Sequence, residues 1–300
     1  MVARLVPILT AGLLLLPLAS ACGGSDEAGG AERERAIAAF YPIAFAVERV
    51  GNGELDVSNL TPPGTEPHEL ELTGRAVERV RSADYIFYLG QGFQPALEDA
   101  AAQSQGRAVD LLLALRLHEA AAAEEDEEHA GEESARDPHV WLDPMRFARL
   151  VERIGEELGR PAEARKLAGE LRELDRELRE GLADCERRAL VTSHAAFGYL
   201  AERYRLRQIP ITGLSPEAEP GPRELEEVVK RVEEERATTI FFETLVSPRL
   251  AETVARETGA KTAVLNPIEG LTEEQIDAGE DYFSVMRENL EAVSAALGCR

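Results

Sequence analysis

The sequence predicts an α/β protein in which a long helix joins two βα lobes. Short apolar strands alternate with helical segments between residues 36 and 112, and the same alternation returns between residues 189 and 297. The segment from Pro161 to about Ala183 is rich in Glu, Arg and Leu and carries oppositely charged pairs four residues apart. At ~1.5 Å per residue, this helix is roughly 35 Å long, about the width of a small domain. Because its leucine repeat is too short to sustain a coiled coil, we predict a rigid connecting helix.

Length and charge limit the classes of protein that fit. The chain has 300 residues, enough for two domains that each bury a core. It carries 33 basic against 56 acidic residues, a net charge of -23. Phosphate recognition needs the opposite sign, so this composition argues against nucleic acid or an anionic membrane surface as a partner. It permits a cationic ligand without indicating one.

Residues 1–21 have the pattern of an export signal. A basic residue lies near the start, an apolar run covers residues 5–18, and small residues precede Cys22. A membrane span needs about 20 apolar residues, and this run is shorter. The segment resembles a bacterial lipoprotein signal, with Ala in place of the more usual Leu three residues before the cysteine; this implies lipidation of Cys22. Residues 22–35 are then a flexible tether.

The N-terminal lobe is predicted to cover residues 36–143. Its expected strands are 37–41, 54–60, 84–89 and 108–112, and its expected helices include 43–50 and 73–81. A Thr-Pro-Pro-Gly turn at residues 61–64 places His68 beyond the carboxyl end of the second strand, the edge at which ligands bind in open α/β sheets. Residues 118–136 are rich in Ala and Glu and lack apolar bulk, so we expect a mobile acidic loop that at most collects metal ions weakly.

His139 lies in the stretch Asp137-Pro138-His139-Val140-Trp141-Leu142-Asp143-Pro144, which contains the single tryptophan of the chain. The two Asp-Pro pairs favour extended or turn backbone over helix. We therefore place His139 in a short extended segment, and we expect a helix to begin after Asp143 with Pro144 at its first position. On these residues alone, a helix-start loop around a half-buried Trp is the simpler interpretation.

The rest of the chain divides into a helical segment, residues 144–184, and a C-terminal lobe, residues 185–300. The expected helices of the segment are 144–158 and 161–183. The expected strands of the lobe are 189–192, 206–212, 239–242 and 262–265. Its expected helices are one that ends at Tyr204 and three more at 223–235, 248–258 and 281–297. His194 follows the first strand of this lobe, and Glu243 ends the third.

Three histidines share a feature that the other two lack. His68, His139 and His194 each follow the boundary of an expected element, and they come from both lobes. Neutral imidazole nitrogen suits the borderline-soft Zn²⁺ ion, so the three form a zinc-type set if they converge. Spacing along a sequence does not fix spacing in space, and the residues alone leave that convergence open.

Four motifs carry a resemblance to a known family. They are Glu66-Pro67-His68-Glu69, Asp137 to Pro144, Thr192-Ser193-His194-Ala195-Ala196-Phe197-Gly198-Tyr199 and Phe242-Glu243-Thr244. Together they resemble the metal-binding lipoproteins of ABC importers, the family 9 solute-binding proteins, and among these the zinc-uptake branch. The similarity runs from about residue 37 to 298. It implies two Rossmann-like lobes, a rigid connecting helix and a metal site in the cleft between the lobes, with His68, His139 and His194 at metal-ligand positions.

The resemblance also implies a function. The chain would be an exported monomer, anchored by lipid at Cys22 on the outer face of the cytoplasmic membrane or in the periplasm. It would capture Zn²⁺ as cargo and deliver it to an ABC permease and its ATPase, without being an enzyme. Manganese members of the family tend to carry Glu where this chain has His194, so zinc is favoured over manganese or iron.

Two functions from other classes stay open at this stage. A three-His site with an open fourth position suits a zinc-dependent hydrolase, although the chain has no His-Glu-x-x-His motif and no residue marked as a general base. A metal-linked adhesin is the other alternative.

The fourth metal ligand is less clearly marked. In the loop where the family usually has Asp, this chain has Asn266, whose uncharged amide oxygen is a poor zinc donor. A site closed at four ligands favours a negative donor, and we expect Glu269, three residues further on. Glu243, Asn266 itself and water are the alternatives, and Glu243 matches a family position that more often supports a ligand from behind.

The cysteines predict one disulfide. With Cys22 lipidated, Cys185 and Cys299 remain as an even pair in an oxidising compartment. Their bond would join the C-terminus to the start of the C-terminal lobe. Two free buried thiols are the alternative.

Overall fold

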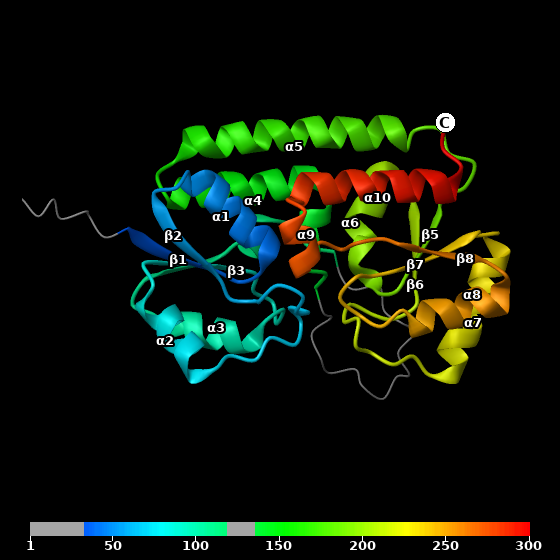
Figure 1. Cartoon of the computed structure of the whole chain (residues 1–300), viewed down its shortest axis with the longest axis horizontal. Coiled ribbons are helices and arrows are strands. Elements are labelled where there is room, and N and C mark those ends of the chain that lie inside the picture. Colours follow the sequence, from blue (N-terminus) through cyan, green and yellow to red (C-terminus); the bar gives the residue numbers. More distant parts are fainter. Residues whose placement is uncertain (1–32, 119–135) are drawn as a thin grey trace, which may run out of the picture. The chain divides into compact units, whose positions relative to one another are not determined.

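The computed structural model describes residues 33–118 and 136–300, which contain two parallel four-stranded sheets (Figure 1). The first sheet has the order β2-β1-β3-β4, with β1 (Glu34–Ala38), β2 (Leu55–Asn59), β3 (Tyr85–Tyr88) and β4 (Arg107–Asp110). The second has the equivalent order β6-β5-β7-β8, with β5 (Ala189–Thr192), β6 (Arg207–Pro210), β7 (Thr239–Phe242) and β8 (Lys261–Val264). The predicted pair of Rossmann-like βα lobes is thereby confirmed.

Helices connect these strands and cover the sheets. The first lobe contains α1 (Tyr41–Gly51), α2 (Gly74–Ser82) and α3 (Pro95–Ala102), followed by α4 (Pro144–Glu157) and α5 (Pro161–Gly181). The second contains α6 (Gly198–Tyr204), α7 (Pro222–Glu234), α8 (Arg249–Thr258), α9 (Glu273–Asp277) and α10 (Tyr282–Leu297). Short 3-10 turns also lie in the described residues, at η1 (Leu112–Ala114), η3 (Val140–Leu142) and η4 (Ala195–Phe197).

The long helix α5 packs against α4, α1 and α10, and α10 runs alongside it (Figure 1). Its buried residues are small or leucine and recur at helical spacing, while its Glu and Arg residues lie mostly exposed. On α10, the Tyr282 ring stacks on Phe45 of α1 at a centroid distance of 5.8 Å. One continuous apolar core therefore includes side chains from both sheets, α4, α5 and α10.

Two local differences from the sequence prediction concern short helical turns. The stretch around His139 is not extended throughout, because η3 follows His139 directly and the N–H of Leu142 donates to the His139 carbonyl at 3.3 Å. This turn carries Trp141 into the core, where it is fully buried. Helix α9 was not predicted; it has five residues and none is buried, so it leaves no apolar period in the sequence.

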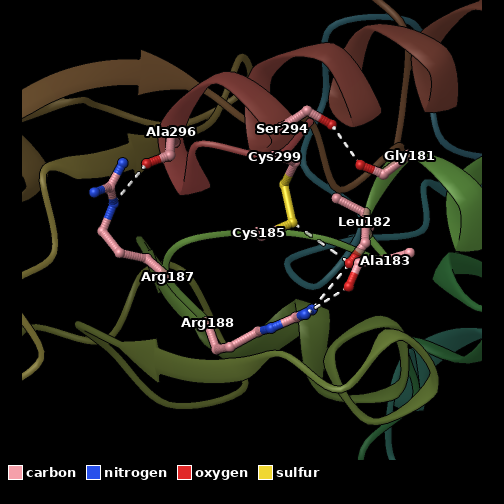
Figure 2. The surroundings of a disulfide bond; sticks show 9 residues. All are labelled: Gly181, Leu182, Ala183, Cys185, Arg187, Arg188, Ser294, Ala296 and Cys299. Atoms are coloured by element: carbon pink, nitrogen blue, oxygen red, sulfur yellow. Dashed lines mark hydrogen bonds between the residues drawn. A yellow bond between two sulfur atoms is a disulfide. The ribbon is translucent and has the colours of Figure 1, made fainter.

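Cys185 and Cys299 are joined by a disulfide (Figure 2). The bond links the segment after α5 to the residues after α10, where the N–H of Arg187 also donates to the Leu297 carbonyl at 3.0 Å. Figure 2 also shows the guanidinium of Arg188, which donates to two carbonyls in the turn that ends α5.

Several predictions fall outside the described residues. They are the export signal, the lipidation of Cys22, most of the tether and residues 119–135 of the acidic loop. Among the helices of residues 33–118 and 136–300, none combines the length and apolarity needed to span a membrane.

Candidate metal centre

Four side chains from loops of both lobes meet in one cluster. His68 lies in the loop after β2, His194 follows β5, and Glu269 lies in the loop after β8. His139 lies just before η3. One potential ligand atom from each of the four lies within 4.8 Å of the others. The structure thus brings together the three predicted histidines and Glu269.

Four of the six distances between these atoms suit one tetrahedral ion. Glu269 Oε1 lies 3.3 Å from Nε2 of His68 and 3.2 Å from Nε2 of His139. The same oxygen lies 3.4 Å from His194 Nε2, and the Nε2 atoms of His139 and His194 are 3.2 Å apart. Bonds of about 2.0–2.1 Å to a tetrahedral Zn²⁺ ion separate neighbouring donors by about 3.3–3.4 Å.

Outer carboxylates orient two of the three imidazoles. His139 Nδ1 lies 2.8 Å from Asp137 Oδ1, and His194 Nδ1 lies 2.7 Å from Glu243 Oε1. With Nδ1–H donated to a carboxylate, the lone pair of Nε2 faces the centre of the cluster. Glu243 therefore contacts the side of the His194 ring that faces away from the cluster, as expected from its family position, and is not one of the four cluster residues.

The cluster is buried, and its charges are strongly coupled. Burial opposes protonation, yet the carboxylates of Glu243 and Glu269 raise the pKa of His194 to about 10. Burial likewise opposes ionisation of Glu269, but the neighbouring imidazoles hold its pKa well below the usual range. Two Nε2 lone pairs and a carboxylate oxygen facing one another repel unless a cation lies among them. A proton or a metal ion meets that requirement.

His68 has a different environment. Burial lowers the pKa of its imidazole, whose ring meets Phe93 edge-on at 4.7 Å between centroids. Glu66 Oε2 accepts a hydrogen bond from the His68 backbone N–H at 2.9 Å. Burial and the negative charge of Glu269 raise the pKa of Glu66 to about 8.

The loop that presents Glu269 is held by side chains from other elements. Asn289 of α10 accepts from the Asn266 N–H at 2.8 Å and donates to the Asn266 carbonyl at 2.7 Å. Asn266 Oδ1 in turn accepts from the Ile268 N–H at 2.7 Å, and Ile268 has a φ of 58°, which a β-branched residue rarely adopts. Trp141 Nε1 donates to the Pro267 carbonyl at 2.7 Å. Asn266 thus supports the loop from outside the cluster.

Sequence reasoning missed Glu66, Asp137 and Asn289. The first two had a readable signal, because each is an acidic residue two positions before a histidine with Pro between. In both cases the carboxylate accepts from the N–H of that histidine, at 2.9 Å. Asn289 had no such signal, since its partner lies 23 residues away.

Two parallel βα lobes with a buried cluster of three histidines and one glutamate between them define a two-lobed metal-binding protein. The chain belongs to the family described as zinc-uptake complex component A, periplasmic, whose model matches residues 37–296. This confirms the resemblance that the four motifs carry.

Known members share most of the chain. It is 36% identical to the zinc-binding lipoprotein AdcA of Streptococcus pneumoniae over an alignment of 303 residues that covers 96% of this chain and 60% of AdcA. The chain therefore spans less than two thirds of that relative. It is 32% identical to the high-affinity zinc uptake system protein ZnuA of Bacillus subtilis, with 93% of this chain and 94% of ZnuA covered.

Solved structures share the fold. The Zn(II)-bound ZnuA-like domain of Streptococcus pneumoniae AdcA matches with a TM-score of 0.72 and 35% identity, covering 89% of this chain and 99% of that domain. The laminin-binding protein Lmb of Streptococcus agalactiae, described as having adhesin and metal-transporting activity, matches with a TM-score of 0.79 and 27% identity, covering 89% of this chain and all of Lmb.

Proposed function

We propose that this protein is the zinc receptor of an ABC importer, which captures Zn²⁺ outside the cytoplasmic membrane and delivers it to a permease and its ATPase. In this proposal His68, His139, His194 and Glu269 bind the ion. The observation that carries it is the convergence of four donor atoms, with Glu269 Oε1 at 3.2–3.4 Å from all three Nε2 atoms. The zinc-binding names of the relatives support it.

The composition of the cluster favours zinc over manganese. Three imidazole nitrogens and one carboxylate oxygen suit a borderline-soft ion with four ligands, whereas manganese prefers sites dominated by oxygen. One carboxylate among the four donors partly neutralises the ion. Binding without turnover follows from this closed set, because a catalytic zinc keeps one position for water or substrate.

The lipid anchor is part of the same proposal. Lipidation of Cys22 would hold the protein on the outer face of the cytoplasmic membrane, as the sequence motif indicates. A Cys22→Ala variant should then leave the membrane fraction, whereas a Cys185→Ala variant should remain in it. If both variants stay in the membrane fraction, the proposed anchor at Cys22 is wrong.

The central test is a zinc titration of metal-free protein against a competing chelator. We expect one equivalent of zinc per chain and a loss of affinity of at least about 10- to 100-fold in Glu269→Gln. His118→Gln is the control, because its side chain pairs with Glu202 and is not one of the four cluster side chains. Unchanged affinity in Glu269→Gln would assign the fourth position to water or Glu243, and turnover of ester or phosphate substrates by the zinc-loaded protein would favour a hydrolase.

Adhesion is a second candidate because of the likeness to Lmb. Deletion of the gene should impair growth under zinc starvation if the protein serves uptake. Normal growth combined with lost binding to laminin would favour the adhesin instead.

A further inference from the structure

His68 is the most exposed of the four cluster side chains. The side chains of His139, His194 and Glu269 are at most 1% exposed. Those of His68 and Glu66 are 11% and 9% exposed. Among the described residues of the site, His68 and Glu66 are therefore the side chains that an ion arriving from solvent can reach first.

One carboxylate oxygen of Glu66 makes no hydrogen bond within the described parts of the chain. Oε2 of this side chain is fixed by the His68 N–H, but its buried Oε1 has no hydrogen-bond partner among the described residues. A buried carboxylate oxygen without a partner is costly to maintain. Because this oxygen lies beside a cation site, we expect a cation to contact it transiently and to supply the missing interaction.

The distances exclude Glu66 from the four-donor set and still allow it to share an ion with His68. Glu66 Oε1 lies 4.0 Å from His68 Nε2, longer than the 3.2–3.4 Å that separates Glu269 Oε1 from the three imidazoles. A tetrahedral zinc ion with bonds of about 2.1 and 2.2 Å holds its nitrogen and oxygen about 3.5 Å apart, so Glu66 Oε1 has to move only about 0.5 Å closer to His68 Nε2 to share an ion with it. His68 thus belongs to both pairs of donors.

We propose that Glu66 is a transfer ligand, which holds the ion together with His68 while it moves between solvent and the buried donors His139, His194 and Glu269. This inference rests on the proposed zinc-receptor function. Glu66 Oε1 replaces a water ligand on the incoming ion, and the buried donors then displace Oε1. On release the order is reversed, so no step leaves the ion with few ligands.

The test compares Glu66→Gln with the parent in stopped-flow experiments at one pH. Trp141 serves as the optical probe, because its ring lies 5.2 Å from that of His139. Zinc loading is followed after mixing with metal-free protein, and release after mixing zinc-loaded protein with excess chelator. We expect both rates to fall about tenfold, which is the effect of about 1.4 kcal/mol on a barrier, while the dissociation constant changes less than about threefold.

Two further variants control for charge and folding. Glu69→Gln removes a neighbouring exposed carboxylate and should leave both rates unchanged. Glu66→Asp keeps the carboxyl group with a shorter reach, and its rates should lie between those of the parent and Glu66→Gln. Thermal melts of every variant check that the fold is retained.

Two outcomes would overturn the inference. Parental rates in Glu66→Gln would show that the ion does not use this oxygen, and a dissociation constant weakened 100-fold or more would make Glu66 a permanent ligand. If the parent itself binds no zinc, the proposed function fails as well. If the parent binds zinc and only the Glu66→Gln rates stay unchanged, the zinc-receptor proposal stands and the transfer role falls.

Discussion

His194 lies between two carboxylates, with Glu243 at its Nδ1 and Glu269 at its Nε2. The contact at Nδ1 fixes the tautomer of the imidazole. At Nε2, the lone pair and the Glu269 oxygen repel each other unless a proton or a metal ion lies between them. A side chain in this position decides which ion the cluster prefers, because it supplies one of the donors and its partners supply negative charge.

Replacing His194 by Glu should move metal preference from zinc toward manganese. The change exchanges a borderline-soft nitrogen for a hard oxygen and leaves two histidines and two carboxylates facing the ion. Competition between Zn²⁺ and Mn²⁺, read out as bound metal per chain, measures the ratio. The control is His118→Gln, and an unchanged ratio in His194→Glu would show that this side chain does not bind the ion.

Zinc binding should release protons. With its pKa at about 10, the His194 imidazole is protonated near neutral pH in zinc-free protein, and coordination removes that proton. Affinity should therefore rise with pH, by about one log unit per pH unit per proton released. Calorimetric titrations at pH 7.5 in two buffers of different ionisation enthalpy count the protons, and a count of zero would contradict this assignment.

The same pKa determines how zinc-free protein responds to pH. Because the folded pKa of His194 lies above the unfolded value near 6.5, its contribution to stability is complete below about pH 6.5 and is lost as pH rises toward 10. Zinc has the opposite pH preference, so the stability gained on adding zinc should grow across this range.

Among the secondary-structure elements, the sequence predicted which segments form strands more accurately than it predicted where each strand begins and ends. The strands Ala189–Thr192 and Thr239–Phe242 match the prediction, because both are short apolar runs between clear breaks. The first strand instead covers Glu34–Ala38, with a helix beginning at Tyr41. The prediction extends that strand to residue 41 and begins the helix at 43, whereas Pro42 suits the first turn of a helix that begins at Tyr41.

The site was predictable to the extent that its residues lie in local motifs. The three histidines were expected from such motifs, whereas Glu269 was expected because Asn266 in the same loop is a poor zinc donor; the structure brings all four together. The support of the Glu269 loop by Asn289 was not predictable, because it depends on how α10 packs beside that loop.

Replacing Asn289 by Ala should weaken zinc binding from outside the cluster. The variant loses two hydrogen bonds to the Asn266 backbone and leaves a buried N–H and carbonyl unpaired, at a cost of about 1–3 kcal/mol in stability. The loop then presents Glu269 less rigidly, and zinc affinity should fall about 10- to 100-fold.

The matched control for this prediction is Glu288→Ala, which changes the exposed neighbour on the same helix. Denaturant melts and chelator-competition titrations measure stability and affinity. If the Asn289→Ala variant is destabilised but binds zinc as tightly as the parent, the support of this loop by Asn289 does not contribute to zinc affinity.

Across the whole molecule, the continuous core that includes α4, α5 and α10 connects the two lobes independently of the metal cluster. The disulfide closes a separation of 114 residues, but both of its cysteines lie in the C-terminal lobe, where the bond joins the start of that lobe to the residues after α10. The relation between the lobes is therefore set by packing, and the cluster adds to it.

The disulfide should contribute to stability without affecting zinc. Chain entropy gives about 4–5 kcal/mol for a loop of this length, an upper value for most proteins. Denatured, unreduced protein should show no reactive thiol from Cys185 or Cys299, and the double Cys→Ser variant should unfold at lower denaturant with unchanged zinc affinity. Two reactive thiols would rule out the bond in solution.

Removing zinc should loosen the loops of the cluster and leave the two lobes in place. Several contacts between the lobes involve no metal ligand side chain. The Tyr282 hydroxyl donates to the Trp141 carbonyl at 2.6 Å, and the N–H of Gly64 donates to the Leu271 carbonyl at 2.9 Å. The Tyr199 hydroxyl donates to the Asp137 carbonyl at 2.8 Å. Each such bond contributes about 0.5–1.5 kcal/mol, and the shared core adds more.

Hydrogen exchange of the zinc-free and zinc-loaded protein distinguishes loop loosening from opening of the lobes. We expect zinc removal to speed exchange in the loops around His68, His139 and Glu269, because these segments lose the ion that joins them. Amides of α5 and α10 should exchange at the same rate in both states, since their hydrogen bonds and packing do not involve the ion. The double Cys→Ser variant should show the same pattern if the core alone fixes the lobes. Faster exchange throughout α5 or α10 in zinc-free parent protein would instead mean that the ion holds the two lobes together.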